Sequence, residues 1–172
     1  MDKDTKKKDK KEGEPEEDAL EDQKEPTQPQ KEEKVILMKK GDYTVHVLIE
    51  EIKNCVEVKE DKLPFPIVKI TCLDKSQRTQ KMKVACTDYT YNEHFYFDKT
   101  NLTAEMLDSE KIIIEAYDAS NSKKEDYFGI HEFDFEYIYN RPDHALHNFW
   151  LALANPESKD ISQVRGYLKL SV

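Results

Sequence analysis

Short segments in which apolar and polar residues alternate run through this 172-residue chain from residue 43 to its end. In the first of them Tyr43, Val45, Val47 and Ile49 occupy every second position, which is the period of a half-buried strand. We expect eight strands, at 43–50, 67–73, 79–86, 94–97, 111–117, 127–135, 148–153 and 166–172. No long amphipathic helix lies between them, so the pattern predicts an antiparallel all-β sandwich or barrel rather than an α/β fold.

The alternation also predicts which side chains are buried. In the segment 79–86 it places Met82, Val84 and Cys86 inward, opposite Lys81, Lys83 and Ala85. In the segment 67–73 it places Val68, Ile70 and Cys72 on one face and Ile67, Lys69 and Thr71 on the other. Cys72 and Cys86 are therefore expected to be buried thiols, and Phe149 and Trp150 to anchor the core. A short helix is expected over 103–110, opened by Thr103 with Met106 and Leu107 facing inward, and a helical or looped insert over 136–144.

Residues 1–33 differ in composition from the rest of the chain. They contain no aromatic residue, and their only large aliphatic side chains are Met1 and Leu20. They hold 8 of the 27 Lys and Arg residues and 13 of the 36 Asp and Glu residues. Such a segment cannot bury enough apolar surface to offset the entropy of ordering. We predict a disordered charged tail over 1–36, solvated or acting as a weak membrane or localisation signal, and one domain over 37–172.

Several functional classes are disfavoured by the composition. The formal net charge of −9 argues against a nucleic-acid partner. Only four glycines are present, which leaves no GxGxxG or phosphate-binding loop. The five histidines show no HExxH spacing, so we expect neither an enzyme nor a small-molecule substrate. No stretch approaches the roughly 20 apolar residues of a membrane span, and three cysteines suit a reducing compartment, so a cytoplasmic protein, either free or peripheral at a membrane, is expected.

Local motifs in the second half of the chain resemble C2 domains. Tyr117–Ser120 followed by Glu125–Gly129 resembles their third loop, and Gly166–Leu170 resembles their last strand. A narrower resemblance is to the second such domain of ferlins, carried by Thr90–Asp98, by Tyr137–His144 and by Asn148–Leu153 with Pro156-Glu157 and Asp160-Ile161. The resemblance covers about residues 43–172. It implies an eight-stranded antiparallel C2-type β-sandwich that binds phospholipid membranes in membrane traffic or fusion.

The same resemblance raises the question of calcium. C2 domains that bind calcium draw two Asp from the first loop and three from the third, because the ion needs six to eight oxygen ligands. Here the third loop supplies Asp118 and Asp126, while its middle position is Ser120 and a first-loop position falls at Phe65. We name Asp118 and Asp126 as a weak, incomplete calcium site, and expect calcium-independent or weakly calcium-dependent behaviour. The alternative is that both are turn residues at strand ends.

Two surfaces are candidates for contact with anionic phospholipids. The first is an apolar loop tip with basic neighbours, formed by Leu63 and Phe65 beside Lys123 and Lys124. Phe65 could instead tuck into the core. The second is a face of the sheet carrying Lys69, Lys81 and Lys83, which is either a headgroup site or an ordinary solvated face. The alternative function is a protein-interaction or scaffold domain without lipid or calcium binding.

Overall fold

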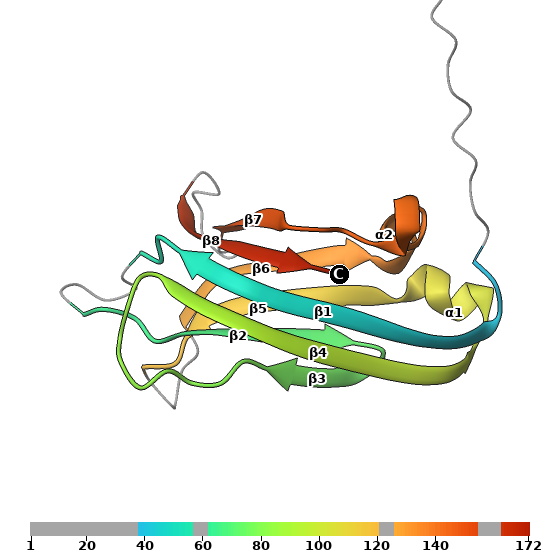
Figure 1. The fold of residues 1–172 in the computed structure, drawn as a ribbon, viewed down its shortest axis with the longest axis horizontal. Coiled ribbons are helices and arrows are strands. Elements are labelled where there is room, and N and C mark those ends of the chain that lie inside the picture. The colour runs from blue at the N-terminus through green and yellow to red at the C-terminus, as the bar shows by residue number, and fades with distance from the viewer. Residues whose placement is uncertain (1–37, 57–61, 121–125, 155–162) are drawn as a thin grey trace, which may run out of the picture. The chain divides into compact units, whose positions relative to one another are not determined.

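Two stacked four-stranded antiparallel sheets make up the domain (Figure 1). The computed structural model describes residues 38–56, 62–120, 126–154 and 163–172. The strands are β1 (Gly41–Lys53), β2 (Pro66–Cys72), β3 (Lys75–Arg78), β4 (Tyr89–Leu102), β5 (Lys111–Asp118), β6 (Asp126–Asp134), β7 (Phe149–Ala154) and β8 (Val164–Ser171). Sheet A has the order β4-β1-β8-β7 and sheet B the order β3-β2-β5-β6. The predicted eight-stranded antiparallel sandwich is confirmed, whereas the predicted tail lies outside the described residues.

The core lies between the two sheets and follows the two-residue alternation. In β1 the inward residues Val45, Val47 and Ile49 are all buried, while Thr44 and His46 between them are exposed. β8 contributes Leu168 and Leu170 to the same interior. Alternation therefore determines which face of each sheet packs, because successive side chains of a strand point to opposite faces.

The third strand is not where the sequence pattern placed it. No strand forms over 79–86; β3 is the short segment Lys75–Arg78, joined to β2 by a two-residue turn. Leu73 and Asp74 both have positive φ, 51° and 61°, as the tight primed hairpin turn requires. That turn brings the chain back onto β2 immediately. The segment 79–86 then leaves the sheet, and its alternation is lost: Met82 is buried but Val84 is exposed.

One face of β2 is also more buried than the alternation predicts. Ile67, expected to face outward, is buried. Its cross-strand neighbour is Tyr117, which in turn pairs with Tyr127, and the two tyrosine rings meet edge to face. Large aromatic neighbours on the outer face of sheet B therefore cover Ile67 near the start of its strand.

Short helices close the end of the sandwich at which β4 and β6 finish (Figure 1). α1 (Ala104–Ser109) begins after Thr103, whose hydroxyl accepts a hydrogen bond from the Met106 amide as an N-cap. Leu107 is buried as predicted, but Met106 is exposed, because a helix of one and a half turns has a single inward face. α2 (Phe135–Tyr139) and a 3₁₀ turn (Pro142–His144) form the predicted insert.

The three cysteines differ in their accessibility. Cys55 and Cys72 are buried, and burial raises the pKa of each thiol to about 12. Cys86, predicted to be buried, is partly exposed because it lies on the connection between β3 and β4 and not in a strand; burial raises its pKa as well. Since the thiolate is the nucleophile, burial lowers the reactivity of Cys55 and Cys72 twice, by blocking access to the sulfur and by raising the thiol pKa.

We expect brief treatment of the native protein with iodoacetamide at pH 8 to modify Cys86 alone. Cys55 and Cys72 should react only after unfolding in urea, which removes burial and returns their pKa values to the ordinary range. Peptide mass spectrometry of native and unfolded samples measures this. The variant Cys86→Ser should show no native labelling, and rapid labelling of Cys55 in it would contradict the packing described.

Candidate functional site

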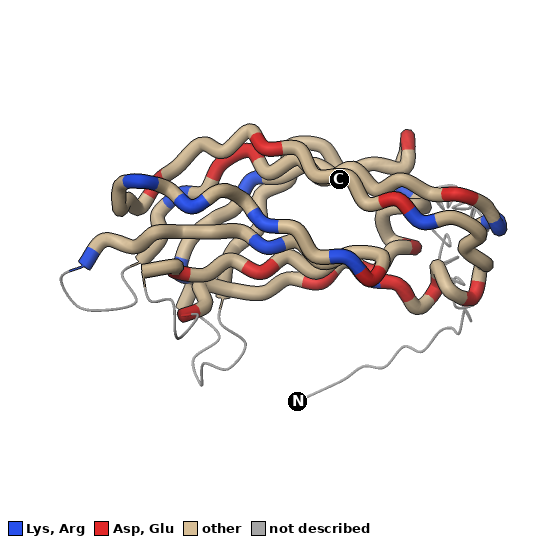
Figure 2. The backbone as a smooth tube through the Cα atoms, turned by 90° about the horizontal axis from the view of Figure 1, so that it is seen from below, with Lys and Arg blue, Asp and Glu red and all other residues tan. Residues whose placement is uncertain are grey.

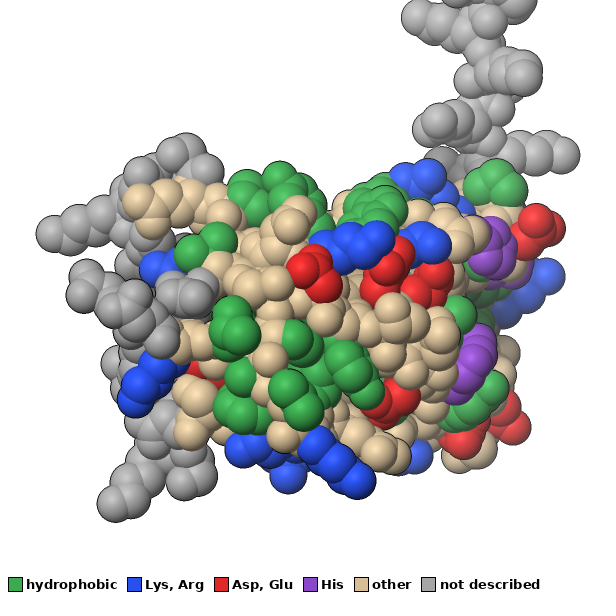
Figure 3. Space-filling model, turned by 60° about the vertical axis from the view of Figure 1, so that its left-hand side comes forward, with side chains coloured by type: hydrophobic (Ala, Val, Ile, Leu, Met, Phe, Trp, Pro, Cys, Tyr) green, Lys and Arg blue, Asp and Glu red, His purple; other side chains and the backbone are tan. Residues whose placement is uncertain are grey.

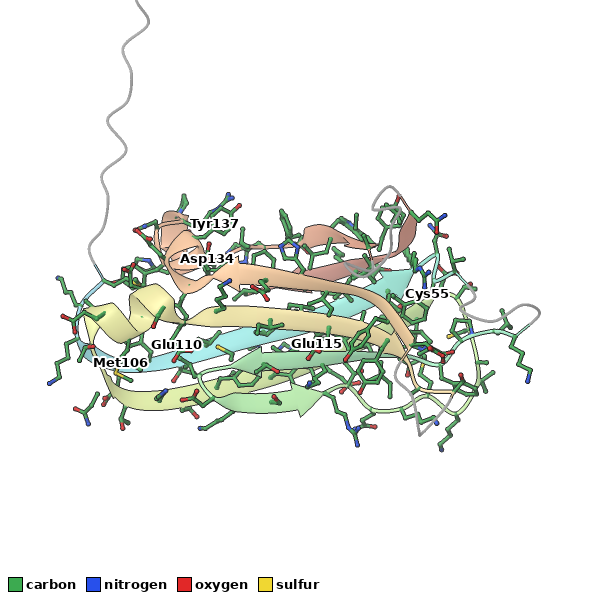
Figure 4. All side chains as sticks on the ribbon, turned by 180° about the vertical axis from the view of Figure 1, so that it is seen from behind. Cys55, Met106, Glu110, Glu115, Asp134 and Tyr137 are labelled. Carbon is green, nitrogen blue, oxygen red and sulfur yellow. The ribbon has the colours of Figure 1, made fainter. Side chains whose placement is uncertain are left out.

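The end of the sandwich opposite the helices, here called the loop end, gathers the connections β1–β2, β3–β4, β5–β6 and β7–β8 (Figure 1). Backbone hydrogen bonds tie the first three of these connections to one another, and the first to β8, across long sequence separations. They are Cys55 N to Thr87 O (3.0 Å), Val56 N to Arg165 O (2.9 Å), Cys86 N to Pro64 O (2.9 Å) and Ala119 N to Phe65 O (2.9 Å). Cys55 marks this end in Figure 4. The described parts of these connections thus form one connected surface.

Asp118 holds the first and third connections of the loop end together. It is the last residue of β5 and only 4% exposed. One carboxylate oxygen accepts hydrogen bonds from the backbone amides of Phe65 and Ser120, each at 2.9 Å, and the other accepts from the Ser120 hydroxyl at 2.8 Å. The carboxylate therefore satisfies backbone donors of its own chain, as a strand-end turn residue does.

Asp126 stands directly across from Asp118. It is the first residue of β6 and pairs with Asp118 in the antiparallel register of the two strands. The structure thus brings the two residues of the predicted calcium pair to the same pair of strand ends. Within the described residues, however, no group of three His, Cys, Asp and Glu side chains is arranged to hold a metal ion.

Lys81 bridges the connections in a way that the sequence did not predict. Its ammonium donates a hydrogen bond to the Ala119 carbonyl at 2.8 Å and lies 5.4 Å from the centre of the Phe65 ring. A cation over an aromatic face adds about 0.5–1 kcal/mol at an exposed site. Phe65 is half-buried beneath this contact. It is thus neither fully exposed at a loop tip nor tucked into the core, which were the two alternatives that the sequence left open. Lys81 therefore joins three connections at the loop end.

Exposed apolar side chains project from the loop end beside lysines. Leu63 is 50% exposed and Val84 is 73% exposed, and the neighbouring Lys62 and Lys83 are also exposed. Figure 3 shows hydrophobic side chains gathered at this end of the molecule, bordered by Lys and Arg. Lys123 and Lys124, expected to flank this tip, lie outside the described residues. Leu63 and Val84 come from different connections, which the hydrogen bond from the Cys86 amide to the Pro64 carbonyl joins close to both residues.

The predicted lysine face of the sheet does not form. Lys69 lies on β2 in sheet B and pairs with Glu115 of β5 at 2.7 Å; Figure 4 labels Glu115 along the sheet and Cys55 at the loop end. Lys81 and Lys83 lie on the β3–β4 connection, because the strand expected over 79–86 is absent. Figure 2 shows Lys and Arg interspersed with Asp and Glu along the backbone of the strands. Lys69 is thus on a strand, whereas the other two lysines are on a connection.

Two cavities lie at opposite ends of the domain. One, of about 660 Å³, adjoins the loop end and mixes apolar with charged walls, among them Met82, Tyr91, Lys83 and Glu93. The other, of about 560 Å³, lies near α2 and is lined mainly by apolar and aromatic residues; His46, His144 and His147 also line it. These volumes are in the range of ligand pockets.

Comparison with known proteins identifies the fold family. The family model described as "C2 domain" matches residues 43–153. The chain belongs to the C2 domain family. This confirms the resemblance to C2 domains on which the sequence interpretation rested, and C2 domains typically bind phospholipid membranes or proteins and are generally not enzymes.

Relatives of this C2 domain are found among ferlins. Myoferlin from Xenopus tropicalis and human myoferlin are each 27% identical over 107 residues, a stretch that covers 62% of this chain and 5% of theirs. Among solved structures, C2 domain A of plant extended synaptotagmin 1 superposes with a TM-score of 0.57 at 19% identity, covering 78% of this chain and 93% of that one. The paired C2 domains A and B of extended synaptotagmin 2 give a TM-score of 0.55 at 12% identity, covering 77% and 38%. The structural likenesses concern the fold alone. None of the described helices is long and apolar enough to cross a membrane.

Proposed function

We propose that this C2 domain is a non-catalytic module that binds the surface of anionic phospholipid membranes with little or no dependence on calcium. The observation that carries the proposal is the loop end. Leu63 and Val84 stand exposed there beside Lys62 and Lys83, and an apolar tip with basic neighbours suits the boundary between headgroups and acyl chains. The setting is a cytoplasmic membrane face engaged in traffic or fusion, without nucleic acid or small-molecule substrate.

The hydrogen bonds of Asp118 support the low calcium dependence. Its two oxygens already accept three hydrogen bonds from Phe65 and Ser120, and Lys81 links the same connections through Ala119 and Phe65. A bound divalent ion would ordinarily draw such loops together by coordinating several carboxylates. Here the amide and hydroxyl donors to Asp118 and the ammonium of Lys81 hold the connections together within the chain. The loop end is therefore organised without a bound ion.

The expected affinity is modest. Each lysine near an anionic leaflet contributes about 1 kcal/mol, and half-exposed apolar side chains contribute about as much each when they are buried. The formal net charge of −9 opposes approach to an anionic surface. We therefore propose the tip formed by Leu63, Phe65 and Val84 with Lys62, Lys81 and Lys83 as a short-range contact, to which Lys123 and Lys124 add charge. Residues 1–36 belong to the proposal as a charged tail ahead of the domain over 37–172.

The full chain should co-sediment with vesicles of phosphatidylcholine and phosphatidylserine equally well in calcium and in chelator. The double variant Leu63→Ser/Val84→Ser should bind about 30-fold more weakly, because it removes about 2 kcal/mol of apolar burial. Met106→Ser is the matched control, since Met106 is an exposed apolar residue on α1 at the opposite end. Binding that requires calcium would contradict the role given to Asp118.

A protein-interaction domain is the second candidate. It is favoured by ion pairs that occupy strand lysines, such as Lys69 with Glu115 and Lys169 with Glu50, both at 2.7 Å. A lysine paired with a carboxylate offers less attraction to an anionic surface. Failure of the full chain to sediment with any of these vesicles would remove the membrane proposal and leave this candidate in its place.

A further inference from the structure

Trp150 points away from the core, contrary to the sequence-based expectation. It lies on β7, where buried and exposed residues alternate: Leu151 and Leu153 are buried, and Trp150 and Ala152 are exposed. Trp150 itself is 42% exposed on the outer face of sheet A. Tryptophan is among the more buried residue types on average, so one left open on a flat sheet face is informative.

Further side chains extend the exposed ring of Trp150 into a surface. Tyr167 of β8 is 41% exposed and lies opposite Ala152 on one side and Lys53 on the other. Trp150 lies opposite Lys169, two residues from Tyr167, which makes the two rings diagonal neighbours on one face. The small Ala152 covers neither ring. We call Trp150, Ala152, Tyr167 and Lys53 the sheet A patch.

The charges of the sheet A patch are largely balanced. The Lys53 ammonium lies 5.3 Å from the centre of the Trp150 ring and 3.0 Å from the Glu51 carboxylate, and Lys169 pairs with Glu50 at 2.7 Å. The patch is thus aromatic and close to neutral. Tryptophan and tyrosine rings with a polar edge are the side chains that favour the headgroup level of a bilayer, where one part of the ring is apolar and the other hydrated.

The patch also continues toward the loop end. Val164, the first residue of β8, is exposed, and Val56, just beyond the end of β1, is exposed as well. The Val56 amide donates to the Arg165 carbonyl, which joins the start of the β1–β2 connection to β8 at the loop end. Exposed apolar side chains therefore continue from the sheet A patch to the edge of sheet A at the loop end.

We infer that the sheet A patch is a second membrane contact, which lies at the headgroup level of a phospholipid bilayer while the loop tip enters it. The domain then docks tilted, with the outer face of sheet A turned toward the membrane. This inference rests on the proposed membrane binding, and it adds both an orientation and a set of residues that the loop tip does not include.

The tryptophan makes the inference directly testable, because it is the only one in the chain. The full chain is mixed with vesicles of phosphatidylcholine and phosphatidylserine in equal parts, and its tryptophan emission is recorded. We expect a blue shift, protection from iodide, and stronger quenching by lipids labelled near the headgroup than by lipids labelled deep in the acyl chain. Co-sedimentation of the same samples reports binding independently.

Substitutions separate this contact from the loop tip. Trp150→Ala should bind vesicles about tenfold more weakly, which corresponds to 1.4 kcal/mol, with an unchanged urea midpoint because its side chain points outward. Tyr96→Ala is the control: Tyr96 is also exposed on sheet A, but it lies on β4 at the opposite edge and should leave binding unchanged. Vesicle binding with no change in Trp150 emission would overturn the inference while the proposed function stands. Absence of all vesicle binding would overturn both.

Discussion

Replacing Gly129 by alanine is expected to destabilise the domain by about 3 kcal/mol, at the upper end of the usual cost of overpacking. Gly129 lies in β6 of sheet B, where the backbone of β7 in sheet A passes closest. A Cβ atom at this position would lie 2.5 Å from the Ala154 nitrogen and 2.9 Å from the Ala154 oxygen. Backbone atoms cannot rotate aside as a flexible side chain can, so the edges of the two sheets would have to separate. Urea unfolding followed by circular dichroism measures the loss.

Gly41→Ala is the matched control for this prediction. A Cβ at Gly41 would meet only a ring carbon of Tyr43, at an ordinary contact distance of 3.8 Å. This variant should unfold within about 0.5 kcal/mol of the original chain. If Gly129→Ala proved equally harmless, the close approach of β6 and β7 described above would be wrong.

Replacing Asp118 by alanine should cost about 2–3 kcal/mol of stability and loosen the loop end. The substitution removes both carboxylate oxygens, which leaves the amides of Phe65 and Ser120 without their partner in a nearly buried place. Losing a buried acceptor costs the desolvation of each stranded donor, and hydrogen bonds to charged groups are stronger than neutral ones. Urea unfolding reports the stability, and hydrogen exchange of the Phe65 amide reports the local loosening.

Asp118→Asn distinguishes this structural role from a calcium ligand. The asparagine oxygen can still accept from the two amides, so the loss of stability should be about half as large. We also expect millimolar calcium to leave the melting temperature of the original chain unchanged, because the Asp118 oxygens already have partners. A rise in melting temperature with calcium that Asp118→Asn abolishes would show that Asp118 binds the ion.

Much of the fold was accessible from the sequence because alternation is a local property. The peptide geometry of a strand sends successive side chains to opposite faces, so the inward residues of β1 could be identified without knowing their partners. Thr103 likewise indicated the start of α1 through a cap that spans three residues. The orientation of Trp150 was also available in this way, since Leu151 and Leu153 define the inward face of β7, and the expectation that Trp150 anchors the core did not use this pattern.

The position of β3 could not be inferred in this way. The segment 79–86 has the alternation of a strand, but a strand also needs a partner strand. The hairpin turn at Leu73–Asp74 pairs Lys75–Arg78 with the edge of β2, so that edge is already occupied when the chain reaches residue 79. Because that pairing moves Lys81 and Lys83 into a connection, the lysine cluster inferred from alternation disappears. The pairing fixed by this one tight turn thus determines where Lys81 and Lys83, which follow β3, come to lie.

The sequence by itself determined the all-β class, most of the strands and the choice of Asp118 and Asp126 as neighbours at strand ends. The tertiary structure decided what those residues do. The partners of Asp118 include the Phe65 amide, 53 positions away in the chain, and Lys81 reaches the Ala119 carbonyl across 38 positions. Periodicity carries no information about such contacts, because they depend on where whole connections come to lie once both sheets have formed.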